Sequence, residues 1–416
     1  MTRPPMRVLP ILALAALAAC ADAPAGPASG PGGLPAADNA AGLALAVTEA
    51  GEVVAYVDST SRLVVRAGDG PEAIVADGAV GSNPQAGPRL AVTSDGGLVV
   101  AYVVQQTVPG RRFPASELRV ARSDDGGRTF AEAVRPHPDP GFPSGHTFHS
   151  LATGPGGTVS VAGLAGVARD RYRRQQAAAR LGEPAPARPE ADGPPMHLAH
   201  EGEDHSGSGP EPGTQLVVAR STDGGRTFEA PVVVADGTCQ CCRTDLHVAD
   251  DGAVYVAWRH IFEDGARDMA IARSDDGGAT FGAPAVVHAD GWAIDGCPHA
   301  GPAVTTDAEG AVHVAWSTGL ADRMGLWHAA SADRGATFGV PSALAAPAPL
   351  GQVRAARNAD GRALFAFEDR GRIGVVAAGA TDTLRVDGAE ADLAVGPDGP
   401  RLLWRGAERV RLGPAL

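Results

Sequence analysis

An eight-residue pattern, S-x-D-x-G-x-T-F, occurs four times in this chain and limits the folds available to it. Each copy ends at a phenylalanine, and the copies begin at Ser123, Ser221, Ser274 and Ser331. In a tight hairpin, the aspartate side chain accepts hydrogen bonds from backbone N–H groups, and the glycine adopts a conformation that other residues disfavour. We therefore predict structural roles for the four aspartates, Asp125, Asp223, Asp276 and Asp333.

A second hairpin pattern, L-A-V-T-x-x-G-x-V-x-V-A-W, precedes each copy, and short strands flank the copy itself. The hairpin lies at 90–102, 151–162, 246–258 and 303–316. It recurs without the eight-residue pattern at 43–57, 353–367 and 391–404. Its small and β-branched residues indicate two buried strands around a tight turn.

These hairpins define seven repeat units, spaced by roughly 50 residues where the unit is intact, and such spacing fits four short strands. The sequence predicts an all-β fold, a single β-propeller of four-stranded blades. The last unit, which ends at Leu416, is short of a fourth strand. Residues 34–41 could supply that strand and give seven blades, or the last unit could merge with the first and give six.

The four copies resemble the Asp-box, or BNR repeat, of sialidases and related propellers, over roughly residues 42–416. The resemblance implies six blades and, in true sialidases, three arginines that bind a substrate carboxylate, an acid/base aspartate and a tyrosine nucleophile assisted by a glutamate. Arg89, Arg243 and Arg354 stand before or at first strands of alternate units, which suggests carboxylate binding. However, none of the four tyrosines lies in the last blades, and the early Arg-Ile-Pro segment of the family is missing. The catalytic set is therefore not part of the resemblance.

The N-terminal segment has the features of an export signal. Arg3 and Arg7 precede an apolar run, residues 8–19, that is too short to span a bilayer permanently. The run ends in Leu-Ala-Ala-Cys at Cys20, which resembles the lipobox of bacterial lipoproteins. The resemblance implies a signal peptide over 1–19, acylation of Cys20, and a protein anchored to the membrane of the bacterial envelope, facing the periplasm or the surface. An ordinary signal peptide with a chance cysteine is the alternative.

Residues 20–41 are rich in Ala, Pro and Gly and predict a flexible tether. The residue after Cys20 is not aspartate, which by the same resemblance favours the outer membrane over the inner. The formal net charge of −13 argues against nucleic acid and against an anionic membrane surface as partners.

Three loops that precede first strands carry the candidate chemistry. In a propeller, these loops and the connections between second and third strands share one face, which we call the top face, and the Asp-box turns lie on the opposite face. The loops contribute His146, His149, Cys239, Cys241, Cys242, Cys297 and His299. Thiolates and imidazoles suit Cu(I), Zn or Fe, so we predict a copper or zinc site from these seven residues. A disulfide between Cys297 and one of the other three is the alternative, and a catalytic or redox thiol is a third possibility.

An insertion at 169–213 falls between the second and third strands of the third unit, hence also on the top face. Its middle contains Met196, His197, His200 and His205 between Pro-, Arg- and Glu-rich flanks. The composition predicts either a mobile loop that delivers or holds a metal, or a tolerated low-complexity insertion.

Together these features favour a non-hydrolytic envelope lipoprotein whose top face binds copper or zinc. One alternative is a glycan- or carboxylate-binding protein, or a divergent exo-sialidase-like glycosidase, that uses the arginines. A second alternative is a protein-interaction scaffold in the envelope, with the propeller as its surface.

Overall fold

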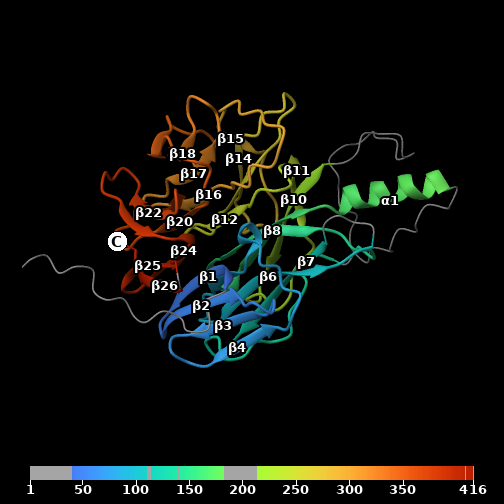
Figure 1. The fold of residues 1–416 in the computed structure, drawn as a ribbon, viewed down its shortest axis with the longest axis horizontal. Helices are drawn as coiled ribbons and strands as arrows, with labels where there is room; N and C mark the ends of the chain where they lie inside the picture. The colour runs from blue at the N-terminus through green and yellow to red at the C-terminus, as the bar shows by residue number, and fades with distance from the viewer. Residues whose placement is uncertain (1–39, 110–113, 139, 182–212, 408, 416) are drawn as a thin grey trace, which may run out of the picture.

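Seven antiparallel sheets are arranged around a central axis in the computed structural model, which describes residues 40–109, 114–138, 140–181, 213–407 and 409–415 (Figure 1). Each sheet is one blade, and strands follow one another in sequence order from the axis outward. The fold is therefore a β-propeller, as predicted, and it has seven blades.

Five blades contain four strands within these residues. Blade one contains β1 (Ala41–Thr48), β2 (Gly51–Val57), β3 (Leu63–Ala67) and β4 (Glu72–Ala76). Blade three contains β8 (His146–Thr153), β9 (Val159–Ala165), β10 (Thr214–Ser221) and β11 (Val232–Thr238). Blade four contains β12 (Asp245–Val248), β13 (Val254–Arg259), β14 (Met269–Ser274) and β15 (Ala285–His288). Blade five contains β16 (Ala303–Thr306), β17 (Val312–Thr318), β18 (Gly325–Ser331) and β19 (Ser342–Ala345). Blade six contains β20 (Val353–Arg357), β21 (Ala363–Asp369), β22 (Arg372–Ala377) and β23 (Leu384–Asp387).

The other two blades have three named strands among the described residues. Blade two contains β5 (Arg89–Val92), β6 (Leu98–Gln106) and β7 (Ala115–Ser123), and a bridge from Val120 to Val134 adds a short fourth segment. Blade seven contains β24 (Ala389–Gly396), β25 (Gly399–Arg405) and β26 (Val410–Pro414).

Blade seven is a sheet of its own, so the six-bladed alternative, in which the last unit merges with the first, is wrong. Strand β1 packs beside β24 and closes the ring. Ala40 and Ala41 are described, and Ala41 begins β1. Residues 34–39 of the predicted closing segment lie outside the described residues, as do the predicted signal peptide and Cys20.

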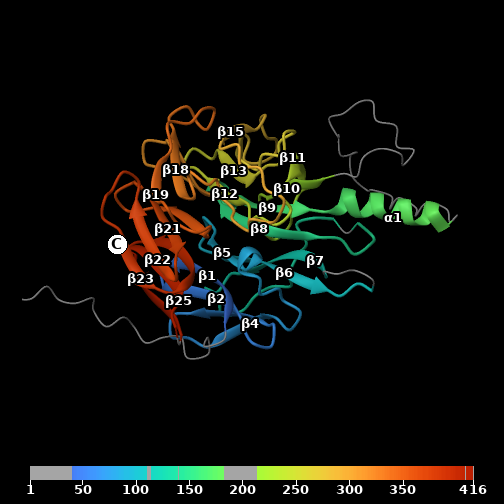
Figure 2. The same cartoon turned by 45° about the horizontal axis from the view of Figure 1, so that its top comes forward.

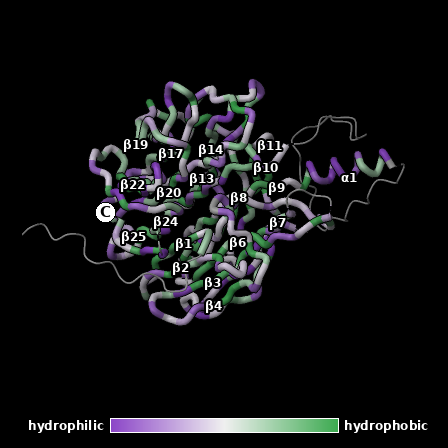
Figure 3. Tube along the Cα trace, viewed as in Figure 1, coloured by the Kyte–Doolittle hydropathy of each residue, from purple (hydrophilic) through white to green (hydrophobic). Residues whose placement is uncertain are grey.

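The hydrophobic core lies between neighbouring blades. One cluster joins Ala44 and Val53 of blade one to Leu98 of blade two, and another joins blades four and five. The aromatic at the end of the hairpin pattern lies on the second strand and is fully buried in five blades, as Tyr56, Tyr102, Trp258, Trp316 and Phe367. Figure 3 shows hydrophobic residues along the strands and hydrophilic residues in the outer loops.

Each Asp-box forms the predicted turn between the third and fourth strands. In the second copy, Asp223 accepts hydrogen bonds from the Arg226 and Thr227 amides (3.0 and 2.9 Å) and from the Thr227 hydroxyl (2.6 Å). Gly225, at φ 87°, donates its N–H to Ser221 Oγ, 2.8 Å away. These hydrogen bonds pair the side chains of the turn with its own backbone amides, which supports a structural role for the aspartate.

The insertion in blade three begins with a helix, α1 (Val167–Leu181), that the sequence interpretation did not anticipate. Figures 1 and 2 both show α1 projecting from the propeller beside β9 and β10. Its Ala, Arg and Gln residues favour a helix, although they carry little apolar periodicity. The remainder of the predicted insertion, including Met196, His197, His200 and His205, lies outside the described residues.

Within the described residues, no helix combines the length and the apolar character that a bilayer span requires.

Candidate functional site

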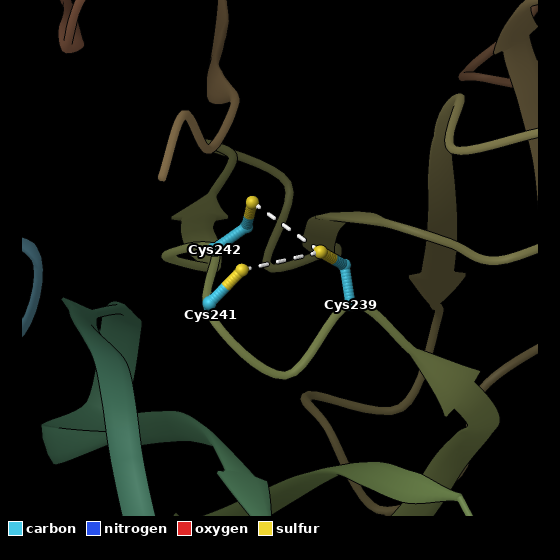
Figure 4. Close-up of side chains that lie close together, drawn as sticks. All are labelled: Cys239, Cys241 and Cys242. Atoms are coloured by element: carbon cyan, nitrogen blue, oxygen red, sulfur yellow. Dashed lines mark hydrogen bonds between the residues drawn. The ribbon is translucent and has the colours of Figure 1, made fainter. Parts of the chain in front are cut away.

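Three cysteines form an open thiol cluster in the loop between β11 and β12. Cys239 Sγ lies 3.7 Å from Cys241 Sγ and 3.5 Å from Cys242 Sγ, and all three side chains are buried (Figure 4). These distances are far longer than a disulfide bond of about 2.05 Å. All four described cysteines are free thiols. Of the described residues, only these three place three metal-ligating atoms within 4.8 Å of one another.

A tight turn brings the three sulfurs together. The Cys242 amide donates to the Cys239 carbonyl oxygen (3.3 Å), and the Cys239 amide donates to the Arg259 carbonyl oxygen at the end of β13 (2.9 Å). Phe148 and Ile261 pack against the cluster and exclude water from one side. The turn therefore directs the three side chains to a common point, as Figure 4 shows.

The cluster favours one thiolate over three. Hydrogen bonds from the Cys241 and Cys242 thiols, with the nearby Arg267 guanidinium, lower the pKa of Cys239. The hydrogen bonds with Cys239 raise the pKa of Cys241 and also raise the pKa of Cys242. A bound cation would remove this conflict, because metal coordination favours the thiolate form of every ligand.

The loop that contains Cys297 and His299 lies next to the cluster, and both side chains are exposed. Arg267 connects the two loops, since its Nη1 donates to the Gly296 carbonyl oxygen at 2.6 Å. Cys297 also contributes, as a minor cause, to the raised pKa of Cys241, so the two thiols interact. His299 adopts φ 52°, and its carbonyl oxygen accepts a hydrogen bond from Gln352 Nε2 at 2.6 Å.

His146 and His149 do not join the thiol cluster. Both lie on β8 and are buried, and a register shift between Thr147 and Ser150 places Phe148, instead of an imidazole, against the cysteines. His149 Nε2 is 3.2 Å from the Ala101 carbonyl oxygen. Burial lowers the pKa of His149 to about 3 and the pKa of His146 to about 4.

The three candidate arginines converge on the central axis. Arg89, Arg243 and Arg354 line a cavity of about 260 Å³ to which the first strands of all seven blades contribute. Arg243 is fully buried and donates to the Val353 carbonyl oxygen. Arg354 Nε donates to Asp392 Oδ1 at 3.1 Å.

These guanidinium groups retain unused donors. Arg89 Nη2, Arg243 Nε and Nη1, and Arg354 Nη1 are buried without a hydrogen-bond partner. Asp245 Oδ1 is 3.6 Å from Arg243 Nη1, too far for a hydrogen bond. Burial, followed by repulsion from Arg354, lowers the pKa of Arg89 to about 9 and holds the pKa of Arg243 well below its usual value. The cavity is thus cationic, and Asp245 and Asp392 offset only part of its charge.

No tyrosine lines this cavity within the described part of the chain. Tyr56, Tyr102 and Tyr255 are buried inside blades, and Tyr172 lies on α1. Tyr56 does donate to a carboxylate, Glu72 Oε1 at 2.6 Å, but this pair joins β2 to β4 within blade one.

Sequence reasoning missed three site residues. Asp245 and Asp392 line the arginine cavity, and the place of Asp245, at the start of β12 and two residues after Arg243, could have identified it. His137 lies against His146, with ring centroids 4.8 Å apart, and no sequence pattern singles it out.

Comparisons with known proteins place the fold. No family model matches the chain, and no curated protein matches it. Among solved structures, it resembles a Hadza microbial sialidase (16% identity over 88% of this chain and 77% of the other, TM-score 0.51). It also resembles an ulvan lyase (12%, 91% and 94%, TM-score 0.52) and the NanB sialidase of Streptococcus pneumoniae (11%, 88% and 82%, TM-score 0.50). At these identities the likeness shows the fold alone.

Proposed function

We propose that this sialidase-like β-propeller binds a metal ion at the thiol cluster of its top face. We further propose that it does not hydrolyse a glycoside. The observation that supports this proposal is the spacing of the sulfurs around Cys239, 3.5 and 3.7 Å. Tetrahedral zinc with Zn–S bonds of about 2.3 Å separates its sulfurs by about 3.8 Å. The cluster needs little rearrangement to hold such an ion.

Copper(I) is the first choice and zinc the second. Three buried thiolates form a soft ligand set, which suits Cu(I). Zinc usually takes four ligands, and Cys297 on the adjacent loop is the available fourth thiolate.

Elemental analysis of the purified full-length chain, prepared under reducing and under oxidising conditions, tests the proposal. We expect one copper or zinc per chain under reducing conditions and its loss in Cys239→Ala and Cys242→Ala. Ser160→Ala is the matched control, because Ser160 is equally buried and its hydroxyl has no hydrogen-bond partner. Absence of metal in both preparations, with all thiols paired in disulfides by mass spectrometry, would contradict the proposal.

A carboxylate ligand in the arginine cavity is the second candidate function. The unpartnered donors of Arg89, Arg243 and Arg354 favour it, because a carboxylate accepts such hydrogen bonds in pairs. A glycan array and a fluorogenic sialoside assay, each repeated with Arg354→Gln, separate this candidate from the first. Loss of binding or turnover in Arg354→Gln, together with unchanged binding or turnover in Cys239→Ala, would support the carboxylate site.

We also propose that Cys20 anchors the protein to the bacterial envelope. The lipobox-like segment before Cys20 supports this. Mass spectrometry of the mature N-terminus tests it: a diacylglyceryl group on Cys20, lost in Cys20→Ala, is expected, and cleavage at another residue would contradict it.

A further inference from the structure

A pair of buried histidines lies beside a second cavity on the top face, separate from the thiol cluster. The cavity, of about 560 Å³, lies between blades two and three, and both His137 and His146 line it. Their ring centroids are 4.8 Å apart and their planes are inclined by 37°. Imidazoles this close, from two different segments of the chain, can bind one ion together.

His137 is the unusual member of the pair. His137 is only 5% exposed, and neither its Nδ1 nor its Nε2 has a hydrogen-bond partner. A buried imidazole normally satisfies at least one ring nitrogen, so two unused nitrogens at the wall of a cavity require an explanation. An ion pair does not provide one, because Glu117, the carboxylate that lines the cavity, already pairs with Arg119 and Arg135.

The wall that carries His146 is braced from outside. Ser144 Oγ donates to Asp170 Oδ2 on α1 at 2.9 Å, and Arg174 of the same helix lies 5.1 Å from the centre of the Phe142 ring. The helix therefore fixes the loop that leads into β8. This arrangement holds one imidazole in place before any ligand arrives, which is the requirement for a specific metal site.

We infer that His137 and His146 bind a divalent transition ion, copper(II) ahead of zinc, at the wall of the 560 Å³ cavity that both residues line. Imidazole is a borderline ligand that suits Cu(II) and Zn(II), whereas the thiol cluster suits softer ions. The two sites are neighbours along β8, because Phe148, two residues after His146, packs against the cysteines. The inference does not depend on metal binding at the thiol cluster.

Electron paramagnetic resonance of the full-length chain tests the inference. The chain is first saturated anaerobically with Cu(I), which is silent in this measurement and occupies the thiols, and Cu(II) is then added. We expect a Cu(II) signal with nitrogen splitting from two imidazoles. His137→Phe and His146→Phe should each lose one bound Cu(II) per chain, because phenylalanine keeps the ring volume and removes the ligand atoms.

His288→Gln is the matched control. His288 lies on β15, at the outer edge of blade four, where it contacts Asp290. All other histidines are common to every sample, so the comparison isolates the pair. An unchanged Cu(II) count and spectrum in His137→Phe or in His146→Phe, with folding verified by circular dichroism, would overturn the inference. If neither variant folds, a wild-type spectrum without coupling to two imidazole nitrogens would also overturn the inference.

Discussion

Arg267 Nη1 lies 3.6 Å from the sulfur of Cys239. The same nitrogen donates to the Gly296 carbonyl oxygen on the loop that contains Cys297. One guanidinium group therefore connects the two cysteine-bearing loops and stabilises negative charge at the thiol cluster.

Replacement of Arg267 by Gln should shift the pH profile of Cys239 alkylation by iodoacetamide to higher pH. The thiolate is the reactive form, and loss of a neighbouring positive charge raises the pKa of Cys239, so we expect the midpoint of the profile to rise by about half a unit to one unit. Mass spectrometry of the modified peptide over time measures the rate at each pH. Arg362→Gln, an exposed arginine in blade six, is the control, and an equal midpoint in both variants would mean that Arg267 acts only on the loop.

Cys297→Ser should distinguish zinc from copper(I) at the thiol cluster. Zinc requires a fourth ligand, so its affinity should fall by at least about tenfold, whereas three thiolates are sufficient for Cu(I). Competition with a chromophoric chelator measures both affinities. Equal losses for the two metals would assign Cys297 to the site irrespective of the metal, and no loss for zinc would exclude it.

The fold was largely predictable because its signals are local. Each hairpin pattern and each Asp-box specifies its own turn, and the seven hairpins correspond to the seven blades, although the sequence left six blades open. The ring closure was not predictable, since the contact between β1 and β24 joins the two ends of the chain. Helix α1 was missed because it packs few apolar side chains, so propensity alone determines it.

The site was predictable only where one loop supplies it. Cys239, Cys241 and Cys242 lie within four residues, and a tight turn must bring them together. The position of His149 depended on a register shift in β8 and on the left-handed φ of Phe148, 55°, neither of which the sequence pattern reveals. A one-residue change in register turns a side chain to the other face of a strand.

Arg122→Ala should destabilise the propeller by about 2 kcal/mol, because this buried arginine joins two blades. Its Nη1 donates to the Gly224 carbonyl oxygen in the Asp-box of blade three at 2.8 Å, and its Nη2 contacts Asp95 at 2.8 Å. Urea denaturation measures the difference.

Arg220 provides the comparison for that measurement. It makes the equivalent contact, from Nη1 to the Asp276 carbonyl oxygen at 2.9 Å, but its side chain is 21% exposed whereas that of Arg122 is 4% exposed. Arg220→Ala should therefore cost about 1 kcal/mol or less. A larger effect for Arg220 than for Arg122 would contradict the burial argument.

The Asp-box turns should make the propeller sensitive to acid. Burial alone would raise the pKa of Asp223, but hydrogen bonds from Thr227 and Ser221 lower it from 3.8 to about 2. Because the folded pKa is below the unfolded value, the turn contributes its full stability above about pH 4 and loses it as the pH falls towards 2. Asp223→Asn should remove this dependence, worth about 1 kcal/mol or less after solvent screening. The unfolding free energy of the wild type, Asp223→Asn and the exposed control Asp382→Asn, measured between pH 2 and 5, tests this; an equal slope in all three would assign the acid sensitivity to other carboxylates.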